Sequence, residues 1–245
     1  MQIKSKVLIS VLLVFAMLLS VSLFAMAATS HYNDASQTGD SAEWTAWTNS
    51  WAQTAADFTK VSVAPGADNT ELNFAWYSKT ADGTATPIVH FGTDKDNLKA
   101  YNGVSAAVDT ALTENVAYDY NHVTVTDLEE NTSYYYTVEK NGTQTSVETI
   151  KTGSFENVKI LLVGDPQIGA SKGQPQGGGE LVADSGKANT AARNDGFAWD
   201  RTLDIAVAQN PDLNFIISAG DQVNKTGNPK EEEYAAFLYP NALAS

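Results

Sequence analysis

Two stretches of similar form decide the fold of the C-terminal half: KILLVGDPQIGA at residues 159–170 and NFIISAGDQVN at residues 214–224. In each, an apolar run ends in a glycine followed by an aspartate, Asp165 in the first stretch and Asp221 in the second. Such continuous apolar runs are typical of parallel strands that are covered on both faces. We therefore expect two buried strands, each of which carries a carboxylate at its C-terminal end.

A helix is predicted between these strands, from about residue 194 to residue 209. Trp199, Leu203 and Ala206 share one face at helical spacing, and Asn210-Pro211 ends the pattern. Parallel strands joined by a crossover helix end at the same edge of one sheet, and ligands of such sheets bind outside that edge. Both aspartates are expected there.

Flanking segments complete the prediction for this half. Residues 170–190 are rich in glycine and polar residues and indicate a long loop of the kind that often serves function. After Asn228-Pro229, a second helix is predicted, with three glutamates in its first turn. Its inner face is expected to carry Tyr234, Phe237 and Leu238.

Two carboxylates at one sheet edge repel each other unless one is protonated or a cation lies between them. Oxygen ligands suit hard metal ions, and glycine before each aspartate leaves space for a ligand. A single Gly-Asp is also a common turn or helix cap. The occurrence of the pair, one βαβ unit apart, favours a metal site at Asp165 and Asp221.

Residues 57–152 predict an all-β sandwich. The segment at residues 71–78 alternates apolar and polar residues with the period of a half-buried strand, and two more strands follow at residues 86–92 and 122–126. Asn141-Gly142 marks the turn of a hairpin over residues 134–150. Several short strands separated by turns are typical of a sandwich.

The N-terminus indicates export. Two lysines precede an apolar run, and Ala25-Met26-Ala27 follows as a cleavage pattern, so residues 1–27 are predicted to be a secretory signal peptide. An uncleaved membrane anchor is the alternative, because the apolar run approaches the length of a spanning helix, but the cleavage pattern favours the signal peptide. Residues 28–56 form an extension in which Trp44, Trp47 and Trp51 share one face of a short helix. We expect that face to pack on the following domain; a tryptophan platform that binds carbohydrate or contacts the cell wall is the alternative.

The composition disfavours some classes of binding partner. The net charge is −14 and there is no cysteine. A negative surface disfavours nucleic acid and anionic membranes, and no stable membrane insertion is expected once the signal peptide is cleaved. Export without cysteine suggests a bacterial protein that is secreted or held at the cell surface.

Two resemblances follow from these motifs. Tyr134, which opens a strand after a leucine and a short polar turn, and Trp76 on an earlier strand resemble the pattern of fibronectin type III domains. LLVGDPQIG and FIISAGDQVN resemble the first two motifs of calcineurin-like metallophosphoesterases. The β domain followed by these motifs is similar to the architecture of purple acid phosphatases.

The resemblance implies a two-domain fold: a fibronectin type III-like sandwich, then, over residues 154–245, the first β-α-β-α part of an α/β metallophosphoesterase sandwich. It also implies two metal ions, which could be Fe, Mn or Zn. Asp165 would bind the first metal and Asp221 would bridge both. Gln167 stands where many members place a histidine ligand.

Two departures from the family pattern stand out. Asn224 replaces the tyrosine ligand of purple acid phosphatases, so a colourless protein is expected, with Asn224 supporting the ligands or forming a turn. The later histidine motifs of the family do not occur, because His31, His90 and His122 all precede the first aspartate and are interpreted as structural or surface residues. Catalytic residues are therefore expected beyond Ser245, in a longer reading frame, and this chain is expected to be inactive.

The resemblance thus implies a secreted dinuclear-metal phosphoesterase that hydrolyses phosphate monoesters by metal-bound hydroxide and binds small phosphorylated substrates. Two alternatives stay open: a phosphodiesterase or nucleotidase of the same fold, and a non-catalytic surface-binding module in which the aspartates only form turns.

Overall fold

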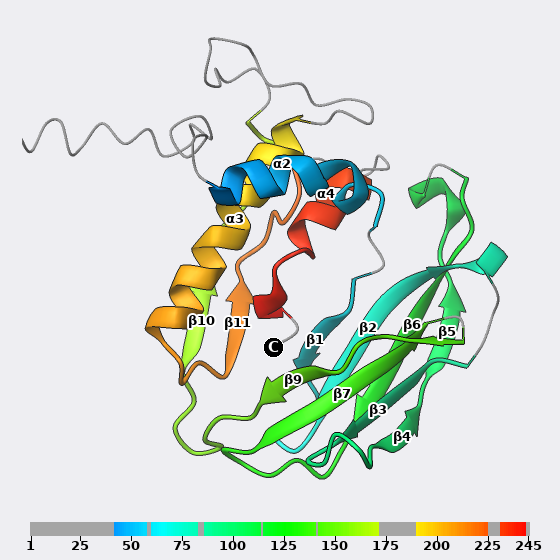
Figure 1. The fold of residues 1–245 in the computed structure, drawn as a ribbon, viewed down its shortest axis with the longest axis vertical. Helices are drawn as coiled ribbons and strands as arrows, with labels where there is room; N and C mark the ends of the chain where they lie inside the picture. The colour runs from blue at the N-terminus through cyan, green and yellow to red at the C-terminus, as the bar shows by residue number, and fades with distance from the viewer. Residues whose placement is uncertain are drawn as a thin grey trace, which may run out of the picture.

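The computed structural model describes residues 42–57, 60–82, 86–113, 115–140, 142–171, 190–224 and 231–243. Figure 1 shows two parts, a β-sandwich and a helical part. In the helical part, three helices pack on two short strands: α2 (Ala42–Thr54), α3 (Thr190–Gln209), α4 (Glu231–Phe237), β10 (Ile160–Val163) and β11 (Phe215–Ser218). Several predicted features lie outside the described residues: the signal peptide, His31, Asn141 of the hairpin turn and the Asn228-Pro229 pair before the last helix. No described helix is long and apolar enough to cross a membrane.

The sandwich consists of two antiparallel sheets. The first has the order β1 (Ser62–Pro65), β2 (Leu72–Lys79), β6 (Tyr118–Val125), β5 (Val104–Ala107). The second has the order β4 (Lys99–Asn102), β3 (Ile88–Gly92), β7 (Ser133–Lys140), β8 (Thr143–Gln144), and β9 (Glu148–Lys151) also pairs with β7. Short 3₁₀ turns lie at Thr80–Asp82, Thr110–Leu112 and Asn241–Leu243.

The sandwich core follows from residue alternation within the strands. In β2, Phe74 and Trp76 are buried while the residues between them are only half-buried. Phe74 packs edge-on against Tyr136 of the opposite sheet, with ring centroids 5.0 Å apart. Side chains from both sheets thus meet in one apolar cluster. The all-β prediction for this region is confirmed.

The hydroxyl of Tyr134 bonds back to the turn that precedes its strand. The backbone N–H of Glu129 donates a hydrogen bond of 2.7 Å to the hydroxyl of Tyr134, and Leu128 beside it is buried. Gly142 has φ +76°, the left-handed conformation that a tight hairpin turn requires. The returning strand of this hairpin is split into β8 and β9.

Three short strands, β1, β4 and β5, were not anticipated from the sequence. Each is four residues long. All of β5 is exposed, and Val104 in it retains 68% exposure. β1 and β4 each contribute one partly buried residue to the core, Val63 and Tyr101, so none of the three strands is long enough or buried enough to show a clear alternation in the sequence.

In the C-terminal part, β10 (Ile160–Val163) pairs in parallel with β11 (Phe215–Ser218), with Val163 opposite Ser218. Helix α3 (Thr190–Gln209) connects them, and α4 (Glu231–Phe237) follows. Helix α3 ends where predicted but begins four residues earlier, and its buried face extends over Ala191 and Ala192. Ala206 is only half-buried.

The expectation that both faces of these strands are covered is wrong for the described residues. Leu161, Val163 and Ile216 pack against the helical cluster, whereas Ile160 and Leu162 are 44% and 70% exposed. Alternate side chains point to opposite faces of a strand, and the described helices cover one face only.

The tryptophan helix α2 (Ala42–Thr54) packs on α3 and α4 rather than on the sandwich that follows it in sequence. Trp47 and Trp51 are buried there, and the indole of Trp47 donates a hydrogen bond of 2.8 Å to the carbonyl of Arg193. Burying two large aromatic rings outweighs proximity in sequence.

The predicted inner face of α4 is also wrong in part. Tyr234 is 43% exposed, and Glu233, Ala235 and Ala236 are the buried residues. The small alanines allow close contacts: Ala236 approaches Gly196 of α3, and Ala235 shares an apolar cluster with Tyr118 of the sandwich. Helix α4 therefore packs against both parts of the molecule.

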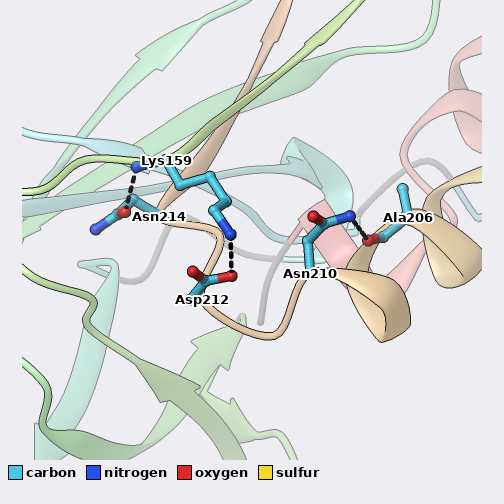
Figure 2. A network of polar contacts seen from close by, with 5 residues as sticks. All are labelled: Lys159, Ala206, Asn210, Asp212 and Asn214. Atoms are coloured by element: carbon cyan, nitrogen blue, oxygen red, sulfur yellow. Dashed lines mark hydrogen bonds and ion pairs between the residues drawn. The ribbon is translucent and has the colours of Figure 1, made fainter.

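Polar contacts tie together the segments that lead into β10 and β11. The side chain of Asn214 accepts a hydrogen bond of 2.8 Å from the N–H of Lys159 (Figure 2). It also donates one of 3.1 Å to the carbonyl of Ser154, in the segment that leaves the sandwich. The ammonium group of Lys159 also pairs with Asp212. The entry to β10 is thus tied to the entry to β11.

Candidate functional site

The loops that follow β10 and β11 lie side by side. The N–H of Gln167 donates to the carbonyl of Asp221 at 2.9 Å, and the N–H of Ile168 donates to that of Gln222 at 3.1 Å. Ile168 and Val223 then form a parallel bridge, and both are buried. The parallel pairing of the strands therefore resumes beyond the two Gly-Asp turns and holds these turns together.

The turns themselves have unusual backbone conformations. Gln167 and Asp221 have φ angles of +38° and +40°, and Gly169 and Gly220 have +102° and +128°. Left-handed conformations at residues other than glycine cost about 1 kcal/mol or more and cluster at functional sites. Two of the four predicted site residues are held in this way.

The predicted site residues are brought to one edge. Asp165, Asp221 and Asn224 are exposed, and Gln167 is half-buried. The side-chain amide of Gln167 donates a hydrogen bond of 3.4 Å to Oδ2 of Asp221. Asn224 contributes its backbone N–H to the carbonyl of Ile168 at 3.0 Å, so it supports the paired loops through its main chain.

This donor set fits a hard metal ion only in part. Carboxylate oxygens suit such ions, but Gln167 presents its NH₂ to Asp221 and would have to turn its oxygen outward to become a ligand. Over the described ranges, no three His, Cys, Asp or Glu side chains are placed to hold a metal. The described residues thus bring two of the predicted ligands, Asp165 and Asp221, to one sheet edge but do not complete a metal site.

Asp195 on α3 is a further residue of the site that the sequence analysis missed. Its Oδ2 accepts hydrogen bonds from the N–H groups of Gly169 at 2.8 Å and Ser171 at 3.2 Å. Burial raises the pKa of Asp195, and the hydrogen bonds from Ser171 and Gly169 oppose that rise. A signal was present, because Asp195 lies four residues before Trp199 and so places an acid on the helix face that was expected to be apolar.

An open cleft of about 720 Å³ lies between β10, the loop that follows it and α3. Asp165, Gln167 and Asp195 contribute to its lining, with Ser171 and Thr202 as further polar groups. Asp221 does not line it. The cleft gives a small molecule access to the first loop from the side of α3.

The described histidines lie away from this cleft. His90 is on β3 and lies 3.6 Å from Glu139 of β7, and His122 is on β6 with its ring stacked near Tyr120. Both are therefore part of the sandwich, as expected. Most of the predicted loop, residues 172–189, lies outside the described residues.

Comparison with known families bears on the sandwich. Residues 58–152 match the family model of the purple acid Phosphatase, N-terminal domain. The sandwich is therefore similar to the N-terminal domain of purple acid phosphatases. No curated protein matches the sequence.

Solved structures extend the likeness beyond the sandwich. A purple acid phosphatase, PPD1, from seeds of yellow lupin (Lupinus luteus) matches with a TM-score of 0.52 and 16% identity over 74% of this chain. PhoD matches with a TM-score of 0.36 and 11% identity over 74% of this chain. The chain spans 33% of the lupin structure and 45% of PhoD. The lupin comparison shows a shared fold.

Proposed function

We propose that the chain provides the N-terminal domain and the first part of the metal centre of a metal-dependent phosphoesterase. The observation that carries this proposal is the pairing of the two Gly-Asp turns: Gln167 and Ile168 donate backbone hydrogen bonds to Asp221 and Gln222 at the C-terminal edge of a parallel sheet. Sheet edges of this kind are where ligands of α/β folds bind. The similarity of the sandwich to the N-terminal domain of purple acid phosphatases supports phosphoester hydrolysis as the reaction.

In this proposal each side chain has a defined task. Asp165 and Asp221 bind cations through exposed carboxylates, while Gln167 either orients Asp221 or adds its amide oxygen. A pair of metal ions (Fe, Mn or Zn) would activate water and neutralise the charge of a phosphoryl group. The cleft beside Asp165 would admit a small phosphate monoester rather than a polymer.

Metal binding gives the direct test. Titration of the purified chain with Mn²⁺, followed by electron paramagnetic resonance, should show a weak site with a dissociation constant on the order of 10⁻⁴ M, because few carboxylates contribute. Asp165→Asn and Asp221→Asn should each weaken binding at least tenfold. Asp212→Asn is the matched control, since Asp212 pairs with Lys159 at the other end of the sheet. Equal affinity in all four proteins would contradict the proposal.

Hydrolysis assays separate the candidate substrates. A monoester, a diester and a nucleotide should be compared with Mn²⁺, Zn²⁺ and Fe²⁺ present. We expect little turnover from this 245-residue chain, because the described residues place too few ligands together. Turnover at an ordinary enzymatic rate of about 1 s⁻¹ or faster would show that this expectation is wrong. Preference among the three substrates would then distinguish phosphatase, phosphodiesterase and nucleotidase.

We also propose export from a bacterial cell, on the basis of the signal-peptide pattern in residues 1–27. Expression in a bacterium and N-terminal sequencing of the secreted product should give a chain that starts at Ala28. A product that keeps Met1 and stays in the cell would contradict this proposal.

The non-catalytic alternative loses one of its supports. A tryptophan platform needs exposed rings, but Trp47 and Trp51 are 4% and 6% exposed. Trp44 is half-buried, packed edge-on against Phe197 and covered by the guanidinium of Arg193. These rings serve the packing of α2, so cell-wall binding through this segment is not part of the proposal.

A further inference from the structure

The first Gly-Asp loop is anchored to α3 through one carboxylate oxygen. Oδ2 of Asp195 accepts from the N–H of Gly169 at 2.8 Å and from the N–H of Ser171 at 3.2 Å. The backbone from Gly169 to Ser171 therefore curls around a single oxygen atom. Hydrogen bonds from amides to a carboxylate are roughly twice as strong as those between neutral groups.

Helix α4 packs against the same loop from another side. Glu233 is fully buried, and a Cβ placed on Gly169 would lie 2.3 Å from its Oε1. Gly169 also has φ +102°, which only glycine adopts readily. Gly169 is thus held between carboxyl groups of α3 and α4, and neither its backbone nor its neighbours leave room for a side chain.

This anchor lies two residues from Gln167, whose own N–H is bonded to the carbonyl of Asp221 at 2.9 Å. The stretch from Asp165 to Ser171 is therefore fixed at two places, by Asp221 and by Asp195. The amide of Gln167 lies at the first of these places, and the exposed carboxylate of Asp165 lies two residues before it. Releasing one anchor would let this short stretch change its backbone angles.

We propose that Asp195 is a positioning residue of the metal centre: it holds the loop after β10 so that Asp165 and Gln167 face Asp221. The proposal rests on the proposed function and assigns a role to a residue outside both motifs. Asp195 acts through the backbone of Gly169 and Ser171 and does not itself bind the metal. Residues that orient ligands in this way typically change metal affinity 10- to 100-fold when they are replaced.

Three variants of the full chain test it. Asp195→Ala removes both hydrogen bonds, Asp195→Asn keeps an oxygen acceptor of the same size without the charge, and Asp204→Asn changes an exposed acid on the same helix. We expect Mn²⁺ affinity, measured by electron paramagnetic resonance, to fall about tenfold in Asp195→Ala and by a smaller factor in Asp195→Asn. Asp204→Asn should match the wild type.

Amide chemical shifts measured without metal provide the second readout. In Asp195→Ala the Gly169 and Ser171 amide protons should move upfield, and the Asp165 and Gln167 amides should also shift, while those of the sandwich stay unchanged. Circular dichroism and the Asp195→Asn variant guard against a general loss of folding. Unchanged Asp165 and Gln167 amides, or unchanged Mn²⁺ affinity in Asp195→Ala, would overturn the positioning role.

The two proposals fail in different ways. If Asp165→Asn and Asp221→Asn leave Mn²⁺ binding unchanged, the metal centre itself is refuted, and the role of Asp195 in it falls too. If those variants lose affinity while Asp195→Ala does not, the metal centre stands and only the positioning role is refuted.

Discussion

The sandwich and the C-terminal sheet bury their apolar side chains in different ways. In the sandwich, Phe74, Val89 and Val138 are fully buried because two sheets face each other. In the C-terminal sheet, Leu161 is half-buried under the helices, while Leu162 beside it is 70% exposed. When apolar and polar residues alternate along the strands of two facing sheets, the apolar faces of both sheets form one shared core. Strands that are apolar on both faces need a covering layer on each side.

This difference bears on how the candidate site is held. The site lies in the part of the molecule with the smaller enclosed core, yet its loops have defined positions. Hydrogen bonds hold them, namely the backbone bonds of Gln167 and Ile168 and those that the carboxylate of Asp195 accepts, and the buried Glu233 packs against Gly169. Apolar packing dominates in the sandwich, whereas the site loops combine the buried Ile168 and Val223 with directional hydrogen bonds.

The largest expected contrast is between one core residue from each part. Phe74→Ala should destabilise the sandwich by about 3–5 kcal/mol, because it leaves a cavity between two closed sheets. Leu162→Ala should change the free energy of unfolding by less than about 0.5 kcal/mol, because its side chain is already in solvent. Urea unfolding with hydrogen exchange of the β6 and β10 amides would separate the two parts. A large loss from Leu162→Ala would show that its face is covered in solution.

A second contrast compares two glycines with positive φ. Gly169→Ala should cost about 2–3 kcal/mol and release the first loop, because backbone strain adds to a clash with Glu233. Gly142→Ala should cost only about 1 kcal/mol, since nothing lies within 4 Å of its added Cβ. Thermal unfolding would measure the cost at both glycines, and the amide shift of Asp221 would report the release of the first loop in Gly169→Ala. Similar costs at the two glycines would argue against the close packing of Glu233 on Gly169.

A smaller effect is expected at the tyrosine that closes the sandwich. Tyr134→Phe leaves the N–H of Glu129 without its 2.7 Å acceptor and should cost about 1 kcal/mol. Tyr101→Phe is the control, because its hydroxyl makes only a long contact of 3.4 Å with the carbonyl of Thr126. The midpoint of urea unfolding measures both. If Tyr101→Phe costs more, the hydrogen bond from Glu129 to Tyr134 contributes little to the stability of the sandwich.

The smallest expected effect depends on pH and concerns α3. Burial, reinforced by Asp204 and opposed by Lys60, raises the pKa of Asp200 to about 6. The folded chain then holds this proton more tightly than the unfolded chain, so stability should fall as the pH rises from about 4 to about 6 and level off above it. Asp200→Asn should remove this slope and stabilise the protein at pH 7 by less than about 1 kcal/mol, after allowing for solvent screening.

Asp212 is expected to change stability with pH in the opposite direction to Asp200. The hydrogen bond from Lys159 lowers the pKa of Asp212, so its contribution is lost as the pH falls, and Asp212→Asn should reduce that loss. Urea titrations of both variants between pH 4 and pH 7 would compare the slopes. Parallel slopes in wild type and Asp200→Asn would contradict the assignment of Asp200.

The success of sequence-based prediction varied with the periodicity of each element. Phe74 and Trp76 alternate with polar residues, and the hairpin around Gly142 has a specific turn pair, so these elements were predicted. β5 carries no buried residue and therefore no period to detect. Tyr234 was placed on the wrong face of α4 because hydrophobicity favours large residues, while close helix packing selected Ala235 and Ala236.

The candidate site was likewise predicted only in part. Asp165 and Asp221 follow directly from strands that end in Gly-Asp, because parallel topology brings strand ends to one edge. Asp195 and Glu233 lie on helices remote in sequence, and their contact with Gly169 depends on how those helices are packed.

By itself the sequence determined which segments become strands and which carboxylates lie at strand ends, because periodicity and turn chemistry are local properties of the chain. Only the tertiary structure decided that α2 packs on α3, that one face of β10 stays exposed, and that Asp195 and Glu233 enclose Gly169. Those outcomes depend on contacts between residues far apart in the chain, where shape and burial select among partners that local pattern leaves equivalent.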